Sequence, residues 1–329
     1  MLLPMAISAK GSGVLVSLNG FLERAMPILT PLGVVLGFLF SPLLSSLRTL
    51  VPWLFAVMTL SGALKLRFRE LGAAVANPAP VGIFFFFSHI LMPLTALALA
   101  LLFNPHAPDT VAGFVLLFSI PTAGSGFIWV SIFHGDGALS LALILIESII
   151  APVVVPLTVS LLLGKSVALD MGGMALSLGI MVVLPTLIGV GTNELSRGRA
   201  TLRLSPLLGP ISKLCLMLVV SINSAAVAPQ VDFRGSTVWS ISVQAIVLGF
   251  VGFAMGWLGS RLGRLSRPQT GTLVFAVGMR NISAAATLAI VFFPPAAALP
   301  AILGMVFQQT IAALAGKLFI PRSTGPIGS

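Results

Sequence analysis

Apolar stretches of about 20 residues recur along the whole chain, and short segments between them carry most of the charged residues. A helix of that length crosses the hydrocarbon core of a membrane. Charged residues make up only 8% of the sequence and the mean hydropathy is +1.10, so the chain lacks the polar residues that a water-facing surface requires. Because the runs lack the alternation of membrane β-strands, the sequence predicts an all-α membrane protein.

Turn residues and charges between the apolar runs indicate ten transmembrane helices. We divide the chain into an N-terminal segment 1–25, a first five-helix repeat 26–164, a second five-helix repeat 165–320 and a tail 321–329. The ten spans are placed at 26–45, 49–64, 79–103, 110–133, 137–163, 170–192, 208–228, 236–260, 269–292 and 296–317.

The Lys and Arg residues predict the orientation. If both termini are cytoplasmic, fourteen of them fall in cytoplasmic segments and only three, Arg48, Lys165 and Arg234, fall outside. We therefore expect an integral protein of the bacterial inner membrane. The net charge of +10 comes from these short clusters, which form no basic face and have no interleaved aromatic residues. They indicate topology and contact with membrane lipid, and nucleic acid is not an expected partner.

The loop around 164–170 leaves five spans on each side, and an odd number of spans per half forces the two halves into opposite orientations. The fourth span of each half contains residues that interrupt a helix. Such paired breaks predict a binding site near the membrane midplane. The candidate residues at the two breaks are Gly124, Ser125, Gly126 and Phe127, and Gly278, Met279, Arg280 and Asn281.

Ionisable residues inside the spans add candidates, because a charge at the bilayer centre costs at least ~2.5 kcal/mol. Arg280 lies at the second break, and Glu147 is the acid at comparable depth. We expect the two to pair. Ser140 lies on the same helix face as Glu147, two turns earlier.

Further polar candidates lie in the third and tenth spans. His89, preceded by Ser88, either carries protons or is a neutral ring bonded to a neighbouring helix. Gln308 and Gln309 either line the site or join helices by hydrogen bonds. The sequence has no metal-ligand or cofactor motif and no nucleophile–base pair, which argues against an intramembrane enzyme.

Two stretches resemble the bile acid:sodium symporter family. One runs from Pro121–Gly126 through Gly135–Ser140 to Ala151–Pro156, and the other from Val277–Asn281 to Gln308-Gln309. The resemblance covers about residues 20–320. It implies a panel domain of spans 1, 2, 6 and 7, a core domain of spans 3–5 and 8–10, and broken spans 4 and 9 that cross in the core. It also implies transport of small organic anions by alternating access, usually with sodium.

The sequence departs from this family where sodium should bind. The resemblance assigns sodium-site positions to Gly126, Phe127, Ala276, Arg280, Ser88, Ser140 and Ile144, and only Ser88 and Ser140 retain a side-chain oxygen there. A hard cation needs several oxygen ligands. We therefore expect no cofactor and no sodium coupling, with the Arg280 guanidinium in place of an ion and Glu147 as its carboxylate.

The expected function is secondary transport of a small organic anion by uniport, exchange or proton coupling. Two alternatives remain open: a sodium-coupled symporter with rebuilt ion sites, and a channel-like or non-transporting membrane protein.

Overall fold

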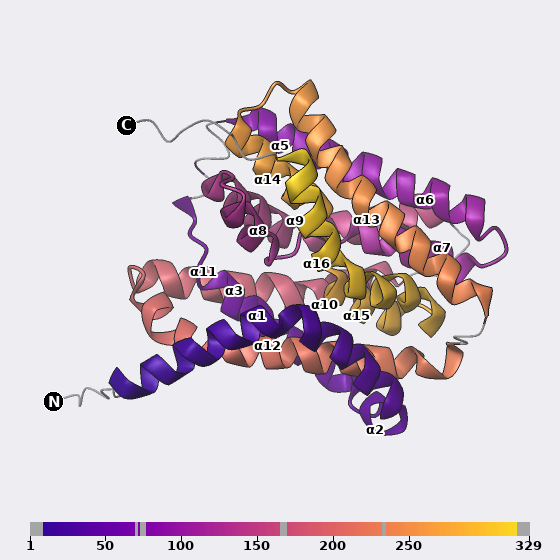
Figure 1. Ribbon diagram of the computed structural model, residues 1–329, viewed down its shortest axis with the longest axis horizontal. Coiled ribbons are helices and arrows are strands. Elements are labelled where there is room, and N and C mark those ends of the chain that lie inside the picture. Colours follow the sequence, from indigo (N-terminus) through magenta and orange to yellow (C-terminus); the bar gives the residue numbers. More distant parts are fainter. Residues whose placement is uncertain (1–8, 70–71, 73–76, 165–169, 232–234, 321–329) are drawn as a thin grey trace. The chain divides into compact units, whose positions relative to one another are not determined.

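The computed structural model describes residues 9–69, 72, 77–164, 170–231 and 235–320. These residues form helices joined by short turns, and the described part contains no β-strand beyond one isolated bridge (Figure 1). The predicted tail 321–329 and the first eight residues lie outside the described residues. The all-α prediction is confirmed.

Six helical segments are long and apolar enough to cross a membrane, and a bent pair, Leu15–Met26 with Ile28–Leu39, raises the number to seven if it forms one span. Each of the ten predicted ranges contains helix, but several of these helices are short or broken. The count of ten spans therefore stays a prediction. The six segments are Pro78–Phe103, Gly137–Leu163, Met171–Leu195, Arg199–Val227, Ser236–Leu262 and Pro295–Phe319.

The chain divides into two compact units, and the first comprises Met1–Phe68 and Ser177–Pro229. In this unit α1 packs along α12, and α12 packs on α3 (Figure 1). Val51, Val219 and Ile222 form a buried cluster between α3 and α12. Its helices are α1 (Ala9–Leu39), α2 (Ser41–Ser45), η1 (Arg48–Leu50), α3 (Val51–Ala63), η4 (Gly179–Val183), α11 (Leu184–Leu195) and α12 (Arg199–Val227).

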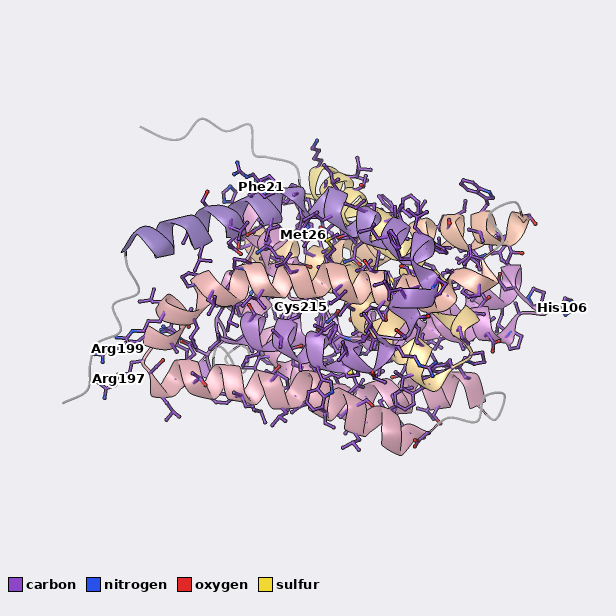
Figure 2. All side chains as sticks on the ribbon, turned by 90° about the horizontal axis from the view of Figure 1, so that it is seen from below. Phe21, Met26, His106, Arg197, Arg199 and Cys215 are labelled. Atoms are coloured by element: carbon purple, nitrogen blue, oxygen red, sulfur yellow. The ribbon has the colours of Figure 1, made fainter. Side chains whose placement is uncertain are left out.

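Small residues permit the close contact of α1 with α12. Gly33 and Gly37 are four residues apart on one face of α1, the spacing that lets two membrane helices approach closely. A Cβ atom on Gly37 would lie 2.6 Å from the Cβ of Ser224 on α12. Figure 2 shows the N-terminal half of α1, with Phe21 and Met26, beside the stretch of α12 that carries Cys215.

Helix α1 begins at Ala9, well before the span that we predicted from residue 26. The polar residues that ended the predicted span have partners on α12. Lys213 Nζ donates to Asn19 Oδ1 at 2.6 Å and lies 3.6 Å from Glu23 Oε2. The helix therefore continues through residues that the sequence pattern treats as a boundary.

The second unit comprises Arg69–Leu176 and Gln230–Ser329. In it α13 packs against α14 and α16, and phenylalanine-rich clusters fill the space around α14. A Cβ on Gly256 of α13 would lie 2.8 Å from Val274 Cα of α14, so glycine permits this contact. The helices are α5 (Pro78–Phe85), η2 (Phe86–Leu91), α6 (Met92–Phe103), α7 (Pro108–Ser119), α8 (Gly126–Ile132), α9 (Gly137–Leu163), α10 (Met171–Leu178, which runs into the first unit), α13 (Ser236–Leu262), α14 (Arg267–Gly278), α15 (Ile282–Phe292), η6 (Pro295–Ala298) and α16 (Leu299–Phe319).

Candidate binding site

Two helix breaks form the centre of the candidate site. Pro121 has no N–H and disfavours helical backbone at the preceding residue, so Ile120 is extended, with φ −68° and ψ 149°, and α7 ends at Ser119. The second break separates α14 from α15, where Met279 is extended, with φ −91° and ψ 90°. Asn281 then caps α15, because its Oδ1 accepts from the N–H of Ala284 at 3.4 Å.

The two breaks bond to each other through their backbones. Ala123 N donates to Met279 O at 2.8 Å, and Asn281 N donates to Pro121 O at 2.9 Å, which makes an antiparallel bridge between Thr122 and Arg280. These bonds satisfy backbone groups that unwinding would otherwise leave unpaired in an apolar interior. The candidate segments at both breaks are thus adjacent.

Arg280 is buried at this crossing, with 1% of its surface exposed. Its Nη1 donates to the hydroxyl of Ser88, and its Nη2 donates to the carbonyl of Phe118 at 3.2 Å. The same Nη1 lies 4.0 Å from Oε1 of Glu147. One guanidinium therefore contacts η2, α7 and α9.

Glu147 is fully buried on α9, and His89 is its nearest ionisable partner. His89 Nε2 lies 2.9 Å from Oε1, and Thr122 N donates to Oε2 at 3.0 Å. The expected pair of Arg280 and Glu147 is present at the longer distance of 4.0 Å. An ionised carboxylate only accepts hydrogen bonds, so the contact with His89 requires a hydrogen on Nε2.

At the first break, contacts with Glu147 and Arg280 replace one hydrogen bond of the helix. In an intact helix the N–H of Thr122 would donate to the carbonyl of Phe118, four residues earlier. Here that N–H donates to Glu147 and that carbonyl accepts from Arg280. Thr122 also donates from Oγ1 to the Ala276 carbonyl at the end of α14, at 2.5 Å. We missed Thr122 and Phe118 in the sequence, although Thr122 directly follows the helix-breaking Pro121.

Ser88 and His89 lie in the π-helical turn η2. Pro93 explains the wider turn, because a proline lacks the N–H that would bond to the carbonyl of His89 and its ring crowds that carbonyl. The ring of His89 stacks on Phe85 with centroids 5.3 Å apart. His89 Nδ1 and Arg280 Nε are buried and have no hydrogen-bond partner among the described residues.

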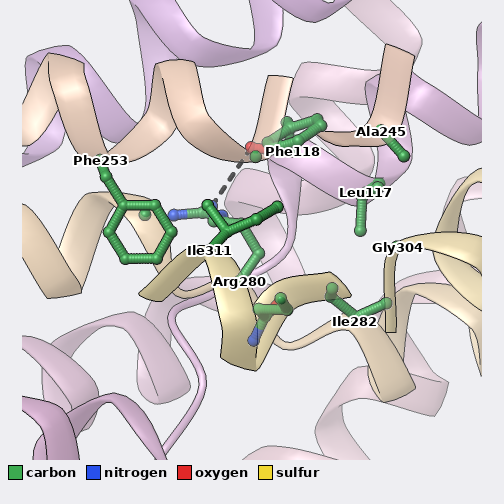
Figure 3. A pocket seen from close by; sticks show the side chains of 11 residues that line it. Leu117, Phe118, Ala245, Phe253, Arg280, Ile282, Gly304 and Ile311 are labelled. Atoms are coloured by element: carbon green, nitrogen blue, oxygen red, sulfur yellow. Dashed lines mark hydrogen bonds between the residues drawn. The ribbon is translucent and has the colours of Figure 1, made fainter. Parts of the chain in front are cut away.

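A small cavity of about 20 Å³ adjoins Arg280 (Figure 3). Gln308 lines it, together with Leu117, Phe118 and Phe253. A cavity needs roughly 10–15 Å³ to hold one water molecule, so this one has room for about one water and for no organic anion. Gln309 has a different role, because its Oε1 accepts from the indole N–H of Trp129 at 2.9 Å and joins α16 to α8.

The remaining sequence candidates differ in burial. Gly126 and Gly278 are buried, and Met279 is fully buried beside Gly126. Ser140 is buried on α9, two turns before Glu147. Gly124 is exposed, Ser125 and Asn281 are half-buried, and Phe127 is half-buried with its ring against Gly137.

The sequence model of the SBF-like CPA transporter family matches residues 32–321. The chain belongs to this family. Among relatives of this SBF-like transporter, the uncharacterised protein YbaS of Bacillus subtilis is 40% identical over 296 residues, which cover 89% of this chain and 96% of YbaS. The family therefore identifies the chain as an integral membrane transporter related to the bile acid:sodium symporters.

Two more distant relatives of the SBF-like transporter carry sodium in their names. The uncharacterised sodium-dependent transporter YocS of Bacillus subtilis is 26% identical over 84% of each chain. The probable sodium/metabolite cotransporter BASS2 of rice chloroplasts is 25% identical over 87% of this chain and 67% of its own.

Proposed function

We propose that the chain is a secondary transporter of a small organic anion that works by alternating access without sodium. We also propose ten membrane-spanning helices in two inverted repeats, divided into panel and core domains, in the bacterial inner membrane with both termini cytoplasmic. The observation that carries the proposal is the buried Arg280 at the crossing of two broken helices, beside Glu147 and His89.

Charge argues against a sodium ion at this crossing. Gly126, Phe127 and Ala276 have no side-chain oxygen to offer a hard cation. A sodium ion about 4 Å from the guanidinium would be opposed by roughly 4 kcal/mol at an effective dielectric constant near 20. The Glu147 carboxylate already has three partners, Thr122, His89 and Arg280.

Arg280 supplies the positive charge that a bound ion would otherwise bring. It holds the carbonyl of Phe118, the hydroxyl of Ser88 and the carboxylate of Glu147 around the two breaks. Because this cation is covalently part of the chain, the crossing keeps its structure whether or not substrate is bound. Uniport or exchange of substrate then requires no co-transported ion.

Negative charge on the substrate is supported by the helix ends at the crossing. The N-terminus of α15 directly follows Asn281 and carries a partial positive charge, and its first residue, Ile282, lines the same cavity as Arg280. Small carboxylates, sulfonates and sterol anions are the classes to test. The cavity beside Arg280 has room for about one water, and the guanidinium contacts the protein's own groups in this conformation.

Counterflow in proteoliposomes tests the proposal. Vesicles preloaded with one unlabelled anion are given the same labelled anion, in sodium buffer and in potassium buffer. We expect saturable counterflow of equal rate in both, lost in Arg280→Gln and kept in the exposed control Arg264→Gln. Uptake that needs sodium would favour rebuilt ion sites, and flux without saturation would favour a channel.

The His89–Glu147 contact favours proton coupling over simple uniport as a second version of the same function. The pair is buried, and a histidine gains and loses a proton near neutral pH. The titratable groups that face Glu147 among the described residues are His89 and Arg280. If protons drive uptake, an inward proton gradient accelerates it in the native protein and has no effect on His89→Gln. Equal acceleration of both would exclude this role of His89.

A further inference from the structure

The turn between α11 and α12 has a fixed, unusual backbone. Arg197 and Gly198 both have positive φ, 53° and 84°, and Gly198 N donates to Asn193 O at 2.9 Å, which caps the end of α11. The Asn193 side chain donates to Leu66 O at 2.9 Å and accepts from Thr201 Oγ1 at 2.6 Å. These bonds join the turn to the segment after α3 and to the first turn of α12.

Four arginines converge at this turn. Arg197, Arg199 and Arg203 line a surface depression of about 530 Å³. The guanidinium of Arg67 lies against Gly198, 2.8 Å from the position that a Cβ would take there. Figure 2 shows Arg197 in the turn and Arg199 at the start of α12, with both side chains pointing outward.

These positive charges have no carboxylate partner in the part of the chain that the structure describes. The acid of the turn is Glu194, and its Oε1 accepts from the backbone N–H of Phe68 at 3.0 Å. The depression therefore offers several guanidinium donors to an external anion. Guanidinium groups match the oxygen geometry of a phosphate.

Exposed leucines flank the arginines. Leu195 is 90% exposed and Leu202 79% exposed, and Leu204 lines the depression itself. The helical segments on both sides, Met171–Leu195 and Arg199–Val227, are long and apolar enough to cross a membrane. The turn therefore lies where a candidate span meets the membrane–water interface, with charged and apolar groups side by side. A free phosphate would use the arginines and leave the leucines uncovered.

We propose that this turn binds the phosphate headgroup of an anionic phospholipid, whose acyl chains cover Leu195 and Leu202. Basic pockets between membrane helices on the cytoplasmic side bind such headgroups, and the positive-inside count places this turn on that side. The site is independent of the ion-pair cluster and of the proposed transport activity.

The test compares thermal unfolding of the full chain in nanodiscs of phosphatidylcholine with and without phosphatidylglycerol. We expect phosphatidylglycerol to raise the unfolding temperature of the native protein. The triple variant Arg197→Gln, Arg199→Gln, Arg203→Gln should lose this rise. The matched variant Arg261→Gln, Arg264→Gln, Arg267→Gln, which removes the same charge at another loop, should keep it.

Three results would overturn the proposal: an unchanged rise in the first variant, an equal loss in both variants, or the same rise from inorganic phosphate added to phosphatidylcholine discs. If the first variant does not fold, native mass spectrometry of the Leu195→Ser, Leu202→Ser variant decides. It should retain less phosphatidylglycerol than the native protein, and equal retention would contradict the acyl-chain contact.

Discussion

Replacing Glu147 by Gln tests whether the buried cluster is an ion pair that the fold depends on. Glutamine keeps the shape and an oxygen that can accept from Thr122 N, but it removes the carboxylate that pairs with the buried Arg280. Arg280 is 1% exposed and the cavity beside it has room for only about one water, so solvent cannot replace the lost partner. Breaking a buried pair in this way costs about 3–5 kcal/mol. Because the bonds of Arg280 to Ser88 and Phe118 remain, we expect the free energy of unfolding to fall by about 3 kcal/mol.

The reverse change, Arg280→Gln, should cost less. It leaves Glu147 with His89 at 2.9 Å, and a histidine can take a proton and balance the carboxylate. Glu147→Gln leaves no group that can balance Arg280 in the same way, because a guanidinium does not lose its proton in proteins. The double variant has neither charge, so its loss should be smaller than the sum of the two single losses.

Reversible unfolding in mixed micelles of dodecyl maltoside and dodecyl sulfate, followed by the fluorescence of the four tryptophans, measures all three losses. Residues in one buried network show coupling of about 0.5–3 kcal/mol, and we expect the upper half of that range. If the loss of the double variant equals the sum of the two single losses within about 0.5 kcal/mol, that result refutes the argument, because independent sites add within that margin. A larger loss for Arg280→Gln than for Glu147→Gln would also refute it.

Four further substitutions, one of them a packing control, should change the free energy of unfolding, and each is measured by the same unfolding. Thr122→Val removes the Oγ1 bond to Ala276 O and should cost about 0.5–1.5 kcal/mol; no loss would mean that this bond does not hold the breaks together. Gly113→Ala pushes a Cβ into the carbonyl of Ala297 and should cost about 1–3 kcal/mol. Gly82→Ala, which meets no atom within 4 Å, should instead stabilise slightly, and equal effects would contradict the packing argument. Lys213→Met loses the bond to Asn19 and the ion pair with Glu23, and it should cost about 1 kcal/mol or less because the site is partly exposed. A larger loss would contradict this expectation.

The helix breaks were predictable from residues that disfavour helix and from their paired positions. Pro121 and Gly278 lie in the fourth predicted span of each half, and a charge as deep as Arg280 requires a partner inside the protein. Neither residue type is sufficient alone, since Pro152 and Pro156 lie inside α9 and Gly304-Met305 lies inside α16. The choice of Glu147 followed from its being the acid at comparable depth. The expected proximity of these residues was therefore within reach of sequence reasoning.

The detailed contacts were not predictable because they depend on packing between distant segments. Nothing in the sequence near His89 shows that its ring lies closer to Glu147 than Arg280 does. Arg280 donates to the carbonyl of Phe118 because the bridge between the two breaks pairs Arg280 with Thr122. Helix α1 was predicted too short for the same reason, since Lys213, the partner of Asn19 and Glu23, lies far along the chain. The inverted repeat and the assignment of panel and core remain predictions.

The central claim, that Arg280 takes the place of a sodium ion, is tested most directly by the thermal stability of the purified protein in sodium chloride against potassium chloride. Ionic strength is matched, and no substrate is present. If the folded protein had a sodium site, a sodium concentration a hundred times its dissociation constant would stabilise the folded state by about 2.7 kcal/mol. We predict equal unfolding temperatures in both salts. A rise specific to sodium would contradict the claim and show that an ion site exists beside, or in spite of, the guanidinium.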